Sequence, residues 1–329
     1  MDWSHARRKL IHLARGGAAL EAPAAAAAAG AEAQEMPIRL DGRVLPPDRG
    51  PPGAADPIGA VRAASISVAS GKGGTGKSIV AASLANLLSI RGRTLLVDLD
   101  LGVGNAHILQ DVSPPQSFVE VVEGSAALRN ILVPCSGQVD LAPAGSGIPR
   151  LAELAPAEMH LVAAGIAEVE RDYRYLVADA AAGVSPQTIG FAGACDVVLI
   201  VTTPDLTAMT DAYAFLKVIL GRRPDARPLL LVNRVEGELE AREVASRISR
   251  VCRRFLGRLP RLVGWIPDDA MVRESVNRRR PLVLHAPEAP ASRALKQAAV
   301  AVIEELHRTH PRGMGWTLLR QLASPFPRP

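Results

Sequence analysis

The residues with the clearest chemical pattern form one short run of glycine, lysine and serine. It reads Gly71-Lys72-Gly73-Gly74-Thr75-Gly76-Lys77-Ser78 and fits G-x-x-x-x-G-K-[ST], the phosphate-binding loop. Its glycines let backbone N–H groups converge on phosphate oxygens. Lys77 is expected to reach the β- and γ-phosphates, and the Ser78 hydroxyl is expected to bind Mg²⁺. The run, with Ile79 after it, therefore predicts a nucleotide site.

Two flanking segments support this interpretation. The apolar, β-branched residues 65–70 precede the loop, and residues 79–88 follow it with the apolar composition of a buried helix. A helix that starts at the loop adds partial positive charge at its N-terminus, which favours phosphate. Because the motif requires a strand before it and a helix after it, a glycine-rich loop that binds no nucleotide is the weaker alternative.

Carboxylates follow two other apolar segments. Asp98 ends the strand pattern at 94–98 and Asp100 follows two residues later, and Asp179 ends the pattern at 175–179. Residues two apart in an extended chain point to the same side, and ligands bind at the carboxyl end of parallel strands. Asp98 and Asp179 are thus predicted to hold Mg²⁺ through its water shell, and Asp100 to orient the water that attacks the γ-phosphate. Two solvated turn residues are the alternative for Asp98 and Asp100.

The rest of the chain predicts an α/β fold. Strand patterns lie at 138–142, 196–201, 228–232 and 262–266, and helical patterns lie near 116–131, 156–171, 207–220, 239–256, 268–277 and 291–309. Continuous apolar strands that alternate with helices are typical of a mostly parallel sheet covered by helices on both faces. One domain is predicted over residues 63–308.

Both ends differ in composition from this domain. Residues 1–62 are rich in alanine and proline and predict a flexible extension, with a short basic amphipathic helix within 1–16. Residues 1–20 carry a net charge of +3 and residues 306–329 carry +4, so the rest carries −2 of the total of +5. The tail at 309–329 predicts a short helix over 315–323, disordered when free, that contacts an anionic membrane surface. Docking of this tail on its own domain is the alternative.

Composition favours a cytoplasmic globular protein. The chain of 329 residues is 48% hydrophobic and 22% charged, and its three cysteines are scattered without a C-x-x-C pair. This pattern favours free thiols in a reducing compartment. There is no run of 18 apolar residues to span a membrane. The N-terminus has basic residues followed by alanines, as a signal peptide does, but His12 and Arg15 interrupt it, so export is not expected.

Lys72, directly after Gly71, gives the loop a second lysine, and lysine is rare in this chain. This K-G-G-x-G-K-S run resembles the deviant Walker A loop of the MinD/ParA superfamily. There the early lysine reaches across a nucleotide sandwich to the phosphates of the partner subunit. The resemblance implies an ATP-dependent homodimer in which Lys72, Lys77 and Asp100 serve hydrolysis, and a P-loop NTPase fold. A solvated lysine is the alternative for Lys72.

Longer segments resemble the FlhG/FleN branch, the MinD-like regulators of flagellar number. The similarity covers roughly 65–305 and includes residues 100–105, 202–213, 241–244 and 272–276. It implies a flagellar signal-recognition-type GTPase, a flagellar transcription activator and flagellar switch components as partners, and peripheral attachment to the inner face of the cell membrane. The chain departs from the branch at Ala180, where Thr or Ser is usual, and at His107 and Gln110. The extension also lacks the D-Q-A-x-x-L-R element of the branch.

In this fold the loops after two strands face the base. Asn233 is expected to pair with the N6 and N7 edges of adenine, and Pro267 to lie near the ring. The stretch 233–236 also resembles the N-K-x-D guanine motif, so GTP stays open. Two other functions stay open as well: a MinD-type regulator of the division site, and a ParA-type DNA-partition ATPase. Arginines from Arg273 to Arg280 would serve the latter, although such a run is more often a solvated helix end, and DNA is the less favoured partner.

Overall fold

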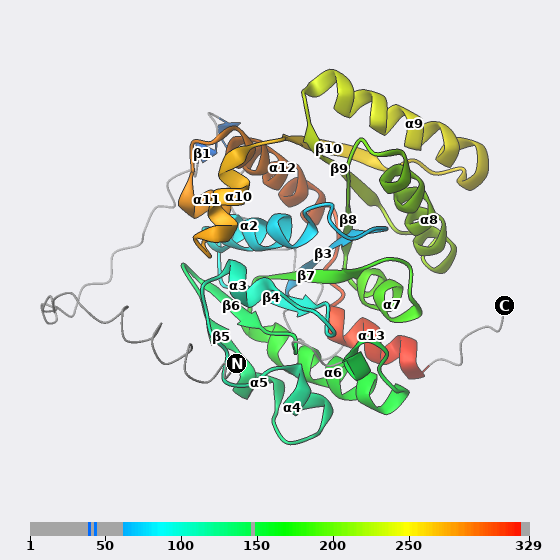
Figure 1. Cartoon of the computed structure of the whole chain (residues 1–329). Helices are drawn as coiled ribbons and strands as arrows, with labels where there is room; N and C mark the ends of the chain where they lie inside the picture. The colour runs from blue at the N-terminus through cyan, green and yellow to red at the C-terminus, as the bar shows by residue number, and fades with distance from the viewer. Residues whose placement is uncertain (1–38, 41–42, 45–61, 146–148, 324–329) are drawn as a thin grey trace, which may run out of the picture. The chain divides into compact units, whose positions relative to one another are not determined.

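The structure, a computed structural model, describes residues 39–40, 43–44, 62–145 and 149–323. Within them one eight-stranded sheet has the order β10-β9-β8-β3-β7-β4-β6-β5, and all neighbours are parallel except β5 and β6 (Figure 1). Its strands are β3 (Ala64–Ser70), β4 (Thr94–Leu99), β5 (Val133–Pro134), β6 (Val139–Ala142), β7 (Tyr175–Ala182), β8 (Val197–Thr202), β9 (Pro228–Val235) and β10 (Arg261–Pro267). A separate antiparallel pair joins β1 (Arg39–Leu40) and β2 (Arg43–Val44). The predicted amphipathic helix within 1–16 lies outside the described residues.

Helices cover both faces of the sheet. They are α2 (Lys77–Ser89), α3 (Ala106–Leu109), α4 (Phe118–Val122), α5 (Leu128–Ile131), α6 (Pro156–Val169), α7 (Pro186–Ala194), α8 (Leu206–Arg222), α9 (Glu238–Leu256), α10 (Ala270–Asn277), α11 (Leu282–His285), α12 (Pro290–Leu306) and α13 (Met314–Ala323). Two 3₁₀ turns, Pro149–Ala152 and Glu170–Asp172, flank α6. Successive side chains of a strand alternate between the faces, so Leu96 packs with α2 and α12 whereas Leu95 packs with α6. The predicted fold class, a mostly parallel sheet with helices on both faces, is confirmed.

The predicted strands from 65 to 266 are all present, but the helices differ in four places. The segment 116–131 forms two short helices, α4 and α5, because Gly124 adopts a left-handed φ of 72° and ends the first. The short helices α3 and α11 and the nine-residue α7 were not predicted. Each of them is shorter than the window over which a helical apolar period can be recognised.

The C-terminal segment is the main correction. Helix α13 packs against α6 and α7, and Met314 and Leu318 are buried in the same core as the sheet. At Gly315 an added Cβ would lie 2.2 Å from the backbone nitrogen of Ala167, so only glycine permits this close approach of α13 to α6. The expectation that 315–323 is disordered when free is therefore wrong, and the packed body extends to residue 323.

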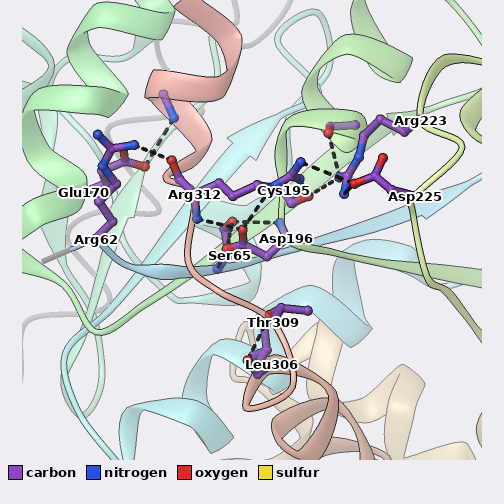
Figure 2. A network of polar contacts seen from close by, with 12 residues as sticks. Arg62, Ser65, Glu170, Cys195, Asp196, Arg223, Asp225, Leu306, Thr309 and Arg312 are labelled. Atoms are coloured by element: carbon purple, nitrogen blue, oxygen red, sulfur yellow. Dashed lines mark hydrogen bonds and ion pairs between the residues drawn. The ribbon is translucent and has the colours of Figure 1, made fainter. Parts of the chain in front are cut away.

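A buried polar network fixes the chain that leads into α13 (Figure 2). The Asp196 carboxylate accepts hydrogen bonds from the Ser65 amide and hydroxyl, at 2.9 and 2.7 Å, and from the Arg312 amide at 2.9 Å. Arg62 donates to the Arg312 carbonyl, and the Gly315 amide donates to the Glu170 carboxylate. The beginning of β3 and the segment before α13 are thus held by one carboxylate. Among the described residues no helix is long and apolar enough to cross a membrane.

Candidate nucleotide site

The glycine-rich loop joins β3, at the centre of the sheet, to α2. Gly76 precedes the helix with a left-handed φ of 89°, and an added Cβ there would lie 2.3 Å from the Asn233 amide nitrogen. Glycine is therefore required at this position by both conformation and space. The Asn233 side chain donates to the Thr75 carbonyl at 2.7 Å, so the C-terminal end of β9 holds the phosphate loop in place.

The loop lines a pocket of about 240 Å³. It is formed by the end of β3, the phosphate loop from Lys72 onward, the start of α2 and the carboxyl ends of β4 and β7: Ser70, Lys72, Gly73, Gly74, Thr75, Gly76, Lys77, Ser78, Ile79, Asp100 and Ala182. The topology explains this meeting, because β4 and β7 lie on the same side of β3 and their carboxyl ends share one edge of the sheet. The pocket thus collects the predicted phosphate-binding residues together with Asp100.

A buried ion pair lies beside the phosphate loop. The Lys77 ammonium is 2.8 Å from the Asp179 carboxylate, and both side chains are buried. The Ser78 hydroxyl lies 3.4 Å from the same ammonium. Lys77 is predicted to bind phosphate and Asp179 to bind the metal shell, and no local sequence pattern indicates that each satisfies the other's charge. An entering triphosphate would take over the lysine and leave Asp179 free to bind a metal's water shell.

Asp98 lies next to Asp179, since the two residues are direct partners in the β4–β7 ladder. Its carboxylate accepts hydrogen bonds from the amides of Asp100, at 3.2 Å, and Ala106, at 3.0 Å. Burial, and then the charge of Asp179, raise the pKa of Asp98 to about 8. Two adjacent buried carboxylates near a serine hydroxyl are hard oxygen donors of the kind that Mg²⁺ prefers. The donor set therefore fits the metal, which would be held by Ser78, Asp98 and Asp179.

Lys72 is exposed, in contrast to the buried Lys77. Its ammonium donates to the Thr207 hydroxyl, 2.8 Å away, in the first turn of α8. Asp205, just before that helix, is close enough for its charge to interact with Lys72, and its pKa is lowered chiefly by a hydrogen bond from Thr203. No local sequence signal marks Thr207 as the contact of this lysine. The two lysines of the loop thus point to different surroundings.

The two predicted base contacts behave differently. Asn233 reaches the phosphate loop, where its amide nitrogen donates to Thr75 and its oxygen accepts from the Arg234 amide. Each of its polar atoms is therefore engaged once by backbone, which leaves one N–H donor and one acceptor position of the amide for another partner. Pro267 ends β10 and pairs with Val235, and it does not line the phosphate pocket. The roles of Asn233 and Pro267 toward the base remain predictions.

A parallel sheet with a glycine-rich loop after its central strand, a buried lysine and two strand-end carboxylates defines a P-loop nucleotide-binding protein. Residues 66–282 match the family model of the CobQ/CobB/MinD/ParA nucleotide-binding domain. The chain belongs to this family, and its resemblance to the MinD/ParA superfamily is confirmed. The predicted ligands, ATP and Mg²⁺, are the ligands that MinD/ParA-family ATPases bind.

Individual relatives refine the comparison. The antiactivator FleN of Pseudomonas aeruginosa is 33% identical over 249 residues, which cover 75% of this chain and 89% of that protein. The flagellum site-determining protein YlxH of Helicobacter pylori is 30% identical, over 73% of this chain and 82% of that protein. Among solved structures, the cell-division ATPase MinD of Pyrococcus furiosus superposes with a TM-score of 0.62 at 22% identity, over 73% of this chain and 98% of that one. That likeness shows the fold.

Proposed function

We propose that this protein is a regulatory ATPase that dimerises around ATP and controls the number or placement of flagella. The observation that carries the proposal is the phosphate loop with its exposed second lysine, on a chain 33% identical to an antiactivator of the FleN type. Hydrolysis returns the dimer to monomers, so the chemistry acts as a timer.

The residues around the pocket divide this chemistry among them. The loop amides and Lys77 bind the β- and γ-phosphates, which removes the lysine from Asp179. Mg²⁺ would supply charge neutralisation on the phosphate oxygens. Asp100, at the pocket wall, orients the attacking water, and phosphoryl transfer depends mainly on such positioning. Lys72 leaves Thr207 and reaches the phosphates held by a second copy of the chain.

The edge of the sheet that carries the pocket is suited to self-association. Three large apolar side chains are exposed after β4, β7 and β8: Val103 at 65% and Val184 at 43% in loops, and Leu206 at 75% at the start of α8. They surround the same edge as Lys72. A two-fold dimer uses one patch on both subunits, so a single apolar edge is sufficient to build it. This supports a homodimer with the nucleotides enclosed between its halves.

Resemblance to the FlhG/FleN branch suggests the cellular context. It supports a cytoplasmic protein at the inner face of the membrane, with a flagellar signal-recognition-type GTPase, a flagellar transcription activator and flagellar switch components as partners. A MinD-type function at the division site is the second candidate, because the chain is also 27% identical to MinD of Bacillus subtilis over 73% of its length.

Two variants test the biochemical part of this proposal. Lys72→Ala is expected to retain ATP binding and lose the ATP-dependent dimer, measured by analytical ultracentrifugation in an Asp100→Ala background. Asp100→Ala alone is expected to bind ATP, accumulate as dimer and lose turnover by about 10²-fold. An intact dimer in the double variant, or turnover within a few-fold of wild type for Asp100→Ala, would contradict the proposal.

The cellular part needs a separate test. Deletion of the gene should change the number of flagella per cell, counted by electron microscopy, with cell length and DNA content unchanged. Minicells or anucleate cells with normal flagella would instead support the division or the partition function.

A further inference from the structure

The end of α9 carries a surface that the core does not use. The helix buries Ala241, Val244, Ala245, Ile248 and Cys252 against the sheet and α8. Beyond them, Val251, Phe255 and Leu259 remain exposed by 37%, 62% and 43%. Beside this apolar row run three exposed arginines, also spaced by four: Arg250, Arg254 and Arg258. Residues four apart share one side of a helix, so the pair Arg250 and Arg254 lies next to the pair Val251 and Phe255. Arg258 and Leu259 directly follow Gly257, the left-handed residue that ends the helix. We call these six residues the α9 ridge.

The ridge is strongly and uniformly basic. From residue 244 to 262 the sequence contains six arginines and no acidic residue. Within the part of the chain that the structure describes, no carboxylate forms an ion pair with Arg250, Arg254 or Arg258, whereas Arg242 and Arg247 nearer the start of the helix pair with Glu238 and Glu243. The Arg254 guanidinium lies 5.1 Å from the centre of the Phe255 ring. The ridge thus offers unneutralised guanidinium groups directly beside exposed apolar side chains.

This combination restricts what can cover the ridge. A second copy of the same surface would be repelled by its charge. A nucleic acid would place phosphates against Val251, Phe255 and Leu259. The three apolar side chains expose on the order of 300 Å², a small apolar area beside the roughly 500 Å² or more that a specific protein interface buries on each partner. A lipid bilayer needs no matching shape, since it accepts apolar side chains at the acyl boundary and arginines at anionic headgroups.

We propose that the α9 ridge is a contact site for an anionic lipid bilayer, in which Phe255 and its apolar neighbours enter the headgroup–acyl boundary. Helix α9 follows β9 and leads into β10 (Figure 1), so its C-terminal end lies where the parallel strands begin, whereas the nucleotide pocket lies at their carboxyl ends. The contact therefore leaves the pocket free and does not require nucleotide. It is also separate from α13, which packs against α6 and α7.

Vesicle co-sedimentation of the full-length protein without nucleotide tests the proposal. The probe is vesicles of phosphatidylcholine containing 30% phosphatidylglycerol, with pure phosphatidylcholine for comparison. One arginine at an anionic surface strengthens binding roughly fivefold, so Arg250→Gln/Arg254→Gln/Arg258→Gln is expected to weaken it on the order of 100-fold. The matched control is Arg273→Gln/Arg280→Gln/Arg293→Gln, which removes the same charge from exposed arginines outside the ridge and should weaken binding much less.

The apolar row requires its own variants. Phe255→Ser should weaken binding about tenfold, and Phe255→Trp should preserve it, because both rings occupy the interface well. Thermal unfolding of each variant checks that the fold is intact. The proposal is overturned if wild type does not pellet with anionic vesicles, or if both arginine triples weaken binding equally. It is also overturned if Phe255→Ser binds like wild type, which would mean that the basic surface attracts a polyanion without insertion, such as a nucleic acid or an acidic protein. Because no nucleotide is present, failure here leaves the ATP-driven dimer untouched.

Discussion

Truncation of one side chain measures how firmly α13 belongs to the body of the protein. Leu318 is 2% exposed and lies in the core with side chains of α6 and α7. Replacement of a buried leucine by alanine removes apolar contacts and leaves a cavity, and costs about 2–5 kcal/mol. A loss of about 3 kcal/mol in the free energy of unfolding lowers the ratio of folded to unfolded protein roughly 150-fold. For a domain of this size it should lower Tm by about 6–12 °C.

Urea unfolding and calorimetry of Leu318→Ala would provide these numbers, and hydrogen exchange of the α13 amides would show whether the helix opens alone. Arg320→Ala is the matched control, because Arg320 lies exposed on the same helix and its loss should change stability by no more than about 0.5 kcal/mol. If the two variants agree in Tm and in α13 exchange, the helix is not docked in solution. The membrane role expected for this tail would then regain its basis.

Three further perturbations address the site and the polar network. Gly76→Ala should fold but weaken nucleotide binding at least tenfold in a fluorescent-nucleotide titration, since its Cβ would displace Asn233 from the phosphate loop. Asp196→Ala leaves buried donors and the Arg312 cation without a carboxylate and should destabilise the protein by about 3–5 kcal/mol in urea unfolding. Burial raises the pKa of Glu170 to about 7, so the folded state holds the extra proton and loses stability as pH rises from about 4.5 to 7. Glu170→Gln should remove this dependence of stability on pH, which is worth on the order of 3 kcal/mol. If the dependence persists in the variant, Glu170 is not the group that causes it.

Sequence patterns predicted the sheet and the pocket because both depend on local order. Each strand is a short apolar run, and Asp98, Asp100 and Asp179 are positioned by being at the ends of such runs. The topology then brings those ends together at one edge. The contact between Asn233 and Thr75 joins residues 158 apart in the chain. No local pattern indicates that the Asn233 amide contacts the phosphate loop in addition to, or in place of, a base.

The C-terminal helix shows a different limit of sequence analysis. A row of apolar side chains on a short helix is equally suited to a membrane surface and to the protein's own core. Only the fit of Gly315 against Ala167, a close approach across 148 positions, decides between them. The ion pair of Lys77 with Asp179 is similar, because each side chain was assigned to a ligand, and the pairing depends on the register of β3 with β7.

The shared carboxylate of Asp196 has a consequence for how the chain can be rearranged. It binds Ser65 at the start of the first sheet strand and Arg312 just before the last helix, and Arg62 hydrogen-bonds to Arg312 directly. The two ends of the sheet domain, as far as α12, therefore meet at one point. A circular permutant that joins Arg312 to Arg62 by a short linker and opens the chain in an exposed surface loop would keep every strand contact of the eight-stranded sheet. Such a chain would lack α13, so it is expected to lose the core contacts of Met314 and Leu318 unless this helix is supplied separately.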